Sequence, residues 1–153
     1  MSLTKRNASL SDAKVLLEWR NSPSARKFSQ KPESIQFEDH LKWLSKRLER
    51  ITFEPFYIFE LGNQSVGMCR LDFESQSPYK FVISILVDPA QHGKGIGTKI
   101  LNMTCTDIFN LYPSSIVIAN VHQDNSVSRK LFENNGFRLE KQFGDFLRFE
   151  KTL

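Results

Sequence analysis

The segment 80–109 constrains the fold most strongly, because it joins an apolar run to a glycine-rich turn and then to a helical pattern. Residues 81–87 are apolar and rich in β-branched side chains, with Ser84 as their single hydroxyl, a composition typical of a strand buried on both faces. Asp88-Pro89 ends the run, because proline removes a ladder donor and pushes its predecessor out of helical geometry. Residues 92–98 hold three glycines. Since glycines let a backbone approach a ligand closely and a helix N-terminus offers free N–H groups, the segment predicts an anion-binding turn.

The glycine spacing excludes the two commonest nucleotide-binding loops. The loop G-x-x-x-x-G-K-[ST] fails because Gly93 and Gly97 are only four residues apart and Thr98 precedes Lys99. The dinucleotide fingerprint G-x-G-x-x-G fails because its third glycine would stand at Thr98. From these residues alone, a glycine-rich turn that binds no ligand stays the alternative.

The turn does resemble the coenzyme A pyrophosphate loop of the GNAT acetyltransferase superfamily, R/Q-x-x-G-x-G/A. Its three key positions correspond to His92, Gly95 and Gly97, and the departure is His92, which follows Gln91. Family members use that position largely through its backbone. The resemblance implies that the pyrophosphate of acetyl-CoA is bound by His92, Gly93, Lys94, Gly95, Ile96, Gly97 and Thr98.

Composition predicts one globular domain, 1–153, because 40% hydrophobic residues with 13 phenylalanines supply a core. No apolar run approaches the roughly 20 residues that span a bilayer, and the N-terminus lacks a signal-peptide core. Cys69 and Cys105 fit buried positions in a reducing cytosol rather than a disulfide or a metal site, so we expect a cytoplasmic protein without metal. The net charge of +4 suits an anionic small molecule. Without an aromatic-basic platform, we expect no nucleic-acid partner.

Periodicity and turn residues predict the element order β-α-α-β-β-β-α-β-α-β-β, a mixed α/β protein. The expected strands are 3–8, 53–61, 65–74, 80–88, 115–121, 137–142 and 146–152, and the expected helices are 12–21, 36–49, the glycine turn to about 109, and 125–134. Hairpin turns are expected at Gly62-Asn63 and Gly144-Asp145.

Two details concern the N-terminal helices. Ser11 is expected as the N-cap of the first helix, and residues 21–34 as a loop. In the helix over 36–49, a helical repeat places one apolar stripe in the core: Phe37, Leu41, Leu44 and Leu48. A neighbouring face carries His40, Trp43 and Arg47.

The C-terminal part extends the resemblance. Ala119-x-Val121-x-x-x-Asn125-x-x-Ser128, followed by Phe132-x-x-x-Gly136-Phe137, resembles the N-x-x-[AS]…G-F segment of GNAT enzymes. In that family the first and fourth positions contact the pantetheine arm and phosphates, which implies this role for Asn125 and Ser128. The alternative is that Asn125 is only an N-cap and Gly136 only a helix stop. The resemblance covers essentially the whole chain and implies a single GNAT domain with a mostly antiparallel central sheet flanked by helices.

The resemblance also implies direct acetyl transfer to a primary amine, without a covalent enzyme intermediate. Two central strands part in this family, which would leave backbone N–H groups near Leu86 and Val87 free to hold the acetyl oxygen. Such donors are worth roughly 3–4 kcal/mol in other acyl-transfer enzymes.

The group that protonates the departing thiolate is not evident. Many family members use a tyrosine at the position that is Phe132 here. Water or an unassisted thiolate are alternatives, and the residues proposed instead for proton transfer are Ser84, Asp72, Asn120 and His122. Ser84 could instead be a buried hydroxyl with a structural role, and His122 could be an exposed loop histidine.

Three N-terminal motifs, Leu16–Asn21, His40-x-x-Trp43-Leu44 and Val66-Gly67-x-x-Arg70-x-Asp72-Phe73, resemble one branch of the superfamily. This branch acetylates nucleotide-linked 4-amino-deoxysugars in pseudaminic- and legionaminic-type pathways and is similar to the ribosomal-protein N-acetyltransferases. Aromatic rings and cations suit a sugar nucleotide, so the expected substrate-binding residues are Arg20, His40, Trp43 and Arg70. Core packing and solvation are the alternative roles of these residues. The acceptor could also be a protein N-terminus or another small amine. A second alternative is a module that binds acetyl-CoA without catalysis. Homodimerisation by an edge strand also stays open.

Overall fold

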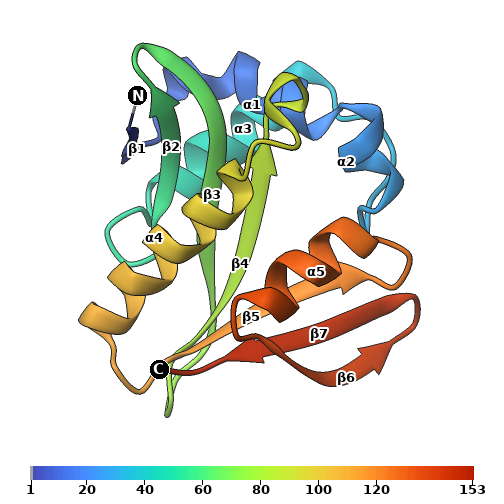
Figure 1. Cartoon of the computed structure of the whole chain (residues 1–153). Coiled ribbons are helices and arrows are strands. Elements are labelled where there is room, and N and C mark those ends of the chain that lie inside the picture. The colour runs from blue at the N-terminus through green and yellow to red at the C-terminus, as the bar shows by residue number, and fades with distance from the viewer. Residues whose placement is uncertain (1) are drawn as a thin grey trace.

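The computed structural model describes residues 2–153, and its elements follow the expected order with one added helix (Figure 1). The strands are β1 (Leu3–Asn7), β2 (Phe56–Leu61), β3 (Gln64–Ser75), β4 (Lys80–Val87), β5 (Ile116–His122), β6 (Arg138–Phe143) and β7 (Phe146–Lys151). The helices are α1 (Ala13–Arg20), α2 (Pro23–Lys27), α3 (Phe37–Leu48), α4 (Ile96–Leu111) and α5 (Ser126–Asn134), with 3-10 turns η1 (Leu10–Asp12) and η2 (Pro89–Gln91). No helix within this range is both long and apolar enough to cross a bilayer.

The strands form one sheet in the order β1-β2-β3-β4-β5-β7-β6. Every neighbouring pair is antiparallel except β4 and β5, which run parallel because α4 connects them. This mixed, mostly antiparallel sheet confirms the expected fold class.

Helices cover both faces of the sheet (Figure 1). On one face, here called the α4 face, α4 and α5 enclose the larger core, which contains Phe81 and Ile83 from β4 and Val117, Ala119 and Val121 from β5. On the opposite α3 face, α1 and α3 pack with Trp19 and Leu44 over Phe56, Ile58 and Met68. Trp19 is therefore a core residue.

The N-terminal region departs from expectation at two places. Pro23 begins α2 inside the stretch expected as a loop, because proline is preorganised for a first helical position and the Ser22 hydroxyl caps the turn. Ser11 does not cap α1. Asp12 instead reaches back to the Ser9 N–H at 2.8 Å, which is a capping interaction one turn earlier.

Helix α3 confirms the predicted apolar stripe in part, because Leu44 is buried and Leu41 and Leu48 pack against the same core. Its buried residues are His40, Leu44 and Arg47, whereas Phe37 is 46% exposed. Leu41 and Leu48 are only half-buried. The repeat did not predict the burial of Arg47, which finds acceptors in Asp72 and in the carbonyls of Glu54 and Leu71.

Strands β2 and β4 also differ from the sequence interpretation. Strand β2 begins at Phe56 rather than residue 53, because the chain turns from Arg50 to Glu54, with the Glu54 N–H bonded to the Arg50 carbonyl at 2.8 Å. Strand β4 is not buried on both faces throughout. Ser84 and every residue from Ile85 to Val87 are only partly buried, because β5 leaves its side.

Candidate active site

Strands β4 and β5 part after a short paired segment. They pair only from Lys80 to Val82 and from Ile116 to Ile118, although β4 continues to Val87 beside β3 and β5 continues to His122 beside β7. Their facing edges beyond these pairs therefore lack a strand partner. Figure 1 shows the two strands diverging, with β4 directed upward and β5 directed to the right.

Backbone alternation identifies which β4 amides face the opening. The Asp88 N–H donates to the Val66 carbonyl at 2.8 Å, on the β3 side. Because successive N–H groups of a strand point to opposite edges, the Leu86 amide also faces β3, and the amides of Ile85 and Val87 face the opening. Of the two amides expected to be free, Val87 fits and Leu86 does not. The Leu86 side chain packs against the α1–α3 core.

The glycine turn after β4 presents a run of free backbone donors. Gly93 and Gly95 have φ of 81° and 74°, and a Cβ at either would meet no atom within 4 Å. Backbone conformation rather than crowding therefore requires glycine there. Gly95 is the N-cap of α4 without a side-chain cap. Among the described residues, none accepts a hydrogen bond from the N–H groups of residues 93–98.

These six consecutive donors at the start of a 16-residue helix fit the diphosphate of a nucleotide coenzyme. Side chains of the turn contribute little to the array. The His92 ring contacts the Val87 carbonyl through Nε2 at 3.1 Å, and Lys94 Nζ donates to Gln91 at 3.3 Å. The Ile96 side chain is buried in the core, so its contribution is limited to its backbone.

The second motif lies at the start of α5. Asn125 Oδ1 accepts the Ser128 N–H at 3.1 Å, so Asn125 acts as an N-cap. Phe132 is buried and its ring centroid is 5.0 Å from that of Phe137, so this position serves packing. Gly136 adopts φ of 88°, as expected for a residue that ends a helix. Coenzyme contacts of Asn125 and Ser128 stay a prediction.

Three of the four residues expected to transfer protons lie beyond the last β4–β5 pair. Val82 and Ile118 lie directly opposite each other. Because residues two positions apart in a strand share a face, Ser84 and Asn120 both point to the α3 face, and so does His122 two residues further along β5. The Asn120 carboxamide oxygen is buried and has no hydrogen-bond partner among the described residues. His122 Nδ1 accepts the Asp124 N–H at 3.1 Å, so the neutral ring carries its proton on Nε2. Its ring lies 5.5 Å from Phe28, which follows α2.

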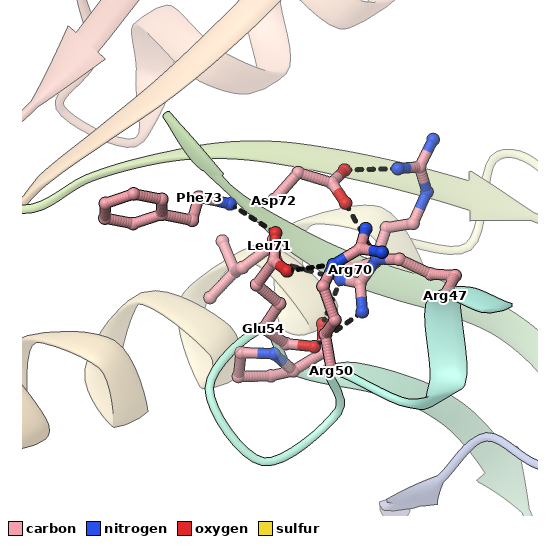
Figure 2. Close-up of polar contacts among 8 residues, drawn as sticks. Arg47, Arg50, Glu54, Arg70, Leu71, Asp72 and Phe73 are labelled. Carbon is pink, nitrogen blue, oxygen red and sulfur yellow. Dashed lines mark hydrogen bonds and ion pairs between the residues drawn. The ribbon is translucent and has the colours of Figure 1, made fainter. Parts of the chain in front are cut away.

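The fourth residue, Asp72, belongs to an ion-pair network (Figure 2). Arg47 is 1% exposed and donates to Asp72 Oδ1 at 2.8 Å, to the Glu54 carbonyl at 2.8 Å and to the Leu71 carbonyl at 2.9 Å. Arg70 donates to the other Asp72 oxygen. With both oxygens bound by guanidinium groups, Asp72 is held as a structural carboxylate, and we do not retain it as a base.

The importance of Arg47 was missed by sequence reasoning, which placed it on a helix face without a role. The local signal was weak, because Arg47 lies in the last turn of α3, where basic side chains are common. Its partners could not be found that way, since Asp72 lies 25 residues along the chain.

The structure brings together three of the four residues expected to bind substrate, with Trp43 between the other two. The Arg70 guanidinium carbon lies 5.1 Å from the centroid of the Trp43 ring, and Trp43 is 41% exposed. His40 lies buried beneath Trp43, and burial lowers the pKa of its imidazole, which favours a neutral core residue. Arg20 donates to the Lys31 carbonyl in the segment after α2.

The chain is similar to known acetyltransferases. Residues 2–138 match the family model described as acetyltransferase (GNAT) domain. Two Campylobacter jejuni proteins named acetyltransferase PseH are 26% and 24% identical over 135 residues, which cover 88% of this chain and 82% of theirs.

Solved structures show the same fold. RimL, a ribosomal L7/L12 α-N-protein acetyltransferase in complex with coenzyme A, superposes with a TM-score of 0.87 at 15% identity, covering 100% of this chain and 95% of that one. The Salmonella typhimurium protein yncA, with its cofactor acetyl-CoA, gives 0.78 at 21% identity, covering 100% and 95%. Within residues 2–153 no group of three or more His, Cys, Asp or Glu side chains is arranged to hold a metal ion.

Proposed function

Because the chain belongs to the GNAT acetyltransferase family and is an N-acetyltransferase that uses acetyl-CoA, we propose that its acceptor is the 4-amino group of a nucleotide-linked amino-deoxysugar. The similarity to two proteins named acetyltransferase PseH supports this choice of branch. The three N-terminal motifs that resemble sugar-nucleotide acetyltransferases agree with this choice.

The coenzyme supplies the acetyl group as an activated thioester when it is bound. The amides of residues 93–98 bind its diphosphate, because they are free donors at a helix N-terminus. The Val87 N–H, which faces the opening between β4 and β5, would hold the acetyl oxygen of the bound coenzyme and stabilise negative charge on it. Preorganised donors of this kind contribute roughly 3–4 kcal/mol.

The acceptor amine approaches from the α3 face, where polar side chains lie beyond the last β4–β5 pair. Ser84 on β4 and His122 on β5 are the groups retained for proton transfer through water, and neither is tied up by an ion pair with an arginine. Holding the amine and the thioester in one opening supplies much of the remaining rate enhancement.

The observation that carries the acceptor proposal is the contact between Arg70 and Trp43. Arg70 lies directly opposite Ser84 in the β3–β4 register and is 27% exposed at its side chain. A guanidinium beside an exposed indole offers a cation for a diphosphate and an aromatic surface for a base or sugar ring. Both features therefore lie on the β4 side of the proposed amine position.

The test is an acetyl-transfer assay that follows release of free coenzyme A thiol. The acceptor panel contains a UDP-4-amino-4,6-dideoxysugar, the same UDP-sugar with a 4-hydroxyl group, and peptides with free N-termini. We expect release with the amino-sugar alone. Release with peptides alone would transfer the assignment to protein N-terminal acetylation. Coenzyme binding without release for any amine would favour a non-catalytic module.

A matched pair of variants tests the binding residues. Trp43→Leu is expected to raise the KM for the nucleotide amino-sugar about tenfold, which corresponds to roughly 1.4 kcal/mol of lost stacking. Phe37→Leu is the control, because Phe37 is a similarly exposed aromatic residue on the same helix. Equal KM values for the two variants would contradict the proposed role of Trp43.

A further inference from the structure

A bidentate ion pair crosses the sheet between strands that are not neighbours. Arg148 on β7 donates to Glu74 on β3 through Nη1 at 2.9 Å and through Nη2 at 2.7 Å. Two strands, β4 and β5, lie between them in the sheet order. The two side chains therefore meet over the α3 face, above the strands that part.

The position of this pair coincides with the start of the opening. Arg148 is in register with Asn120, which lies two residues beyond Ile118, the last β5 residue paired with β4. Glu74 lies beside the residue pair Phe73 and Phe81, at the paired end of β4. The ion pair thus connects the two sides where their backbone hydrogen bonding ends.

Few other contacts connect the two sides of the opening on the α3 face. Among the described residues, the Arg148–Glu74 pair is the only side-chain hydrogen bond or ion pair between residues 2–113 and residues 114–153. The ring contact of Phe28 with His122 also crosses, near the far end of β5. On the α4 face a continuous apolar core joins the sides, but apolar packing is not directional.

The chemistry of the pair suits a geometric restraint. A guanidinium fork that binds both oxygens of a carboxylate fixes orientation as well as distance. The Arg148 side chain is only 14% exposed and also has Glu140 Oε2 at 2.9 Å, a contact without hydrogen-bond geometry. The hydrogen bond from Arg148 lowers the pKa of Glu74, so Glu74 stays ionised and paired at neutral pH.

We propose that the Arg148–Glu74 pair is a positioning element that sets the separation of β4 and β5 at the acetyl-transfer site. This inference rests on the proposed function. The Val87 amide lies on one side of the opening, and Asn120 and His122 lie on the other. A change in strand separation therefore changes the distance between the acyl-holding amide and the groups near the amine, while the diphosphate cradle, which lies wholly on the β4 side, keeps its shape.

The kinetic test is a double-mutant cycle of Glu74→Met, Arg148→Met and the double variant. Because small misplacements of reacting groups are costly, we expect each single variant to lower kcat on the order of tenfold, with affinity for coenzyme A changed less than about threefold. The double variant should resemble the single variants. Arg148→Lys, which retains the charge and loses the fork, should lower kcat in the same way. Independent, multiplicative losses in the double variant would overturn the inference, as would full activity of Arg148→Lys.

A second measurement does not depend on turnover. Spin labels on Lys46→Cys in α3 and Val127→Cys in α5 report the distance between the two sides, since Cys69 and Cys105 are buried and stay unlabelled. We expect Arg148→Met to shift or broaden this distance, and Arg129→Met, which removes an exposed arginine paired with Glu133, to leave it unchanged. An unchanged distribution in Arg148→Met would refute the positioning role.

The two measurements also separate this inference from the proposed function. A wild-type protein that binds coenzyme A but acetylates no amine would remove the proposed function, and the label distances would still decide whether the pair sets the strand separation. If the wild-type protein acetylated the amine normally but the effects of Glu74→Met and Arg148→Met were additive in the double variant, only the positioning role would be removed.

Discussion

The glycine turn of residues 92–98 follows the end of β4, whereas the Arg47 network joins α3 to β3, and the two regions are built in different ways. The turn uses main-chain N–H groups from one continuous segment, and its geometry depends on left-handed residues such as Gly95. The network uses side chains from α3, the turn before β2, and β3, with Arg47 at its centre (Figure 2). A site made of backbone can be recognised from a short motif, whereas a site made of distant side chains becomes visible only after folding.

The two regions should also fail differently when they are mutated. Damage to the turn removes coenzyme binding and leaves the core intact, because the turn is exposed. Damage to the network lowers the unfolding free energy, because Arg47 at its centre is buried and its partners depend on it. Four predictions test this contrast.

The largest effect is expected for Arg47→Met. This substitution leaves the Asp72 carboxylate and the carbonyls of Glu54 and Leu71 without their buried donor, which should cost about 3–5 kcal/mol of unfolding free energy. Urea denaturation measures the loss. Arg129→Met is the control, since Arg129 is 43% exposed and its ion pair with Glu133 is worth less than about 1 kcal/mol. Similar losses for both variants would remove the central role of Arg47.

The next effect concerns binding rather than stability. Gly95→Ala places a side chain at φ of 74°, which costs roughly 1–2 kcal/mol and should weaken coenzyme A binding by about tenfold in calorimetry. Gly97→Ala is the control, because Gly97 lies outside the left-handed region and its added Cβ would have no neighbour closer than 3.7 Å. If Gly95→Ala bound the coenzyme normally, the turn could not be the cradle.

A smaller effect is expected from acid. Burial alone would raise the pKa of Glu54, but the hydrogen bonds from the Phe73 N–H and Arg50 outweigh burial, so the pKa lies below the ordinary value of a glutamate. A carboxylate whose pKa is lowered by folding stabilises the protein fully above its unfolded-state pKa, and this stabilisation is lost as pH falls through the folded-state pKa.

Thermal unfolding between pH 3 and 7 checks this expectation. Glu54→Gln should show a shallower loss of Tm below about pH 4.5 than the wild type. Glu38→Gln, in the exposed first turn of α3, is the matched control and should follow the wild-type curve. A Glu54→Gln curve parallel to that of the wild type would contradict the network's contribution.

The smallest effect is expected at the cysteines. Burial raises the pKa of Cys69 to about 12 and that of Cys105 to about 11, so both thiols stay protonated and inaccessible at pH 8. A thiol reagent should modify neither cysteine before unfolding, and Cys105→Ser should retain the wild-type kcat. Rapid modification of the native protein, or loss of turnover in the variant, would reopen a nucleophilic role for cysteine.

Much of the fold was predictable because strand and helix patterns are local. The order of strands and helices, the turn at Gly62 and the helix stop at Gly136 all depend on residues close in the chain. The short helix α2 was missed because residues 21–34 were expected as a loop, although Pro23 is preorganised for a first helical position. The burial of His40 and Arg47 in α3 was missed because only the apolar repeat was used to choose the core residues.

The site was predictable to the extent that it consists of backbone. Gly93 and Gly95 indicated the cradle, and the resemblance indicated the parted strands, but the choice between Leu86 and Val87 required the register with β3. The role of Asp72 could not be predicted, because a carboxylate in a strand has the same sequence pattern whether it is free or bound by two arginines.

The sequence by itself determined the strand–turn–helix cradle, because glycine conformation and helix termini are set by neighbouring residues. Tertiary structure alone decided which side chains meet across the sheet: Arg47 with Asp72, Arg70 with Trp43, and Arg148 with Glu74. These contacts join residues from different elements, and their geometry depends on how strands and helices pack, which no local pattern records.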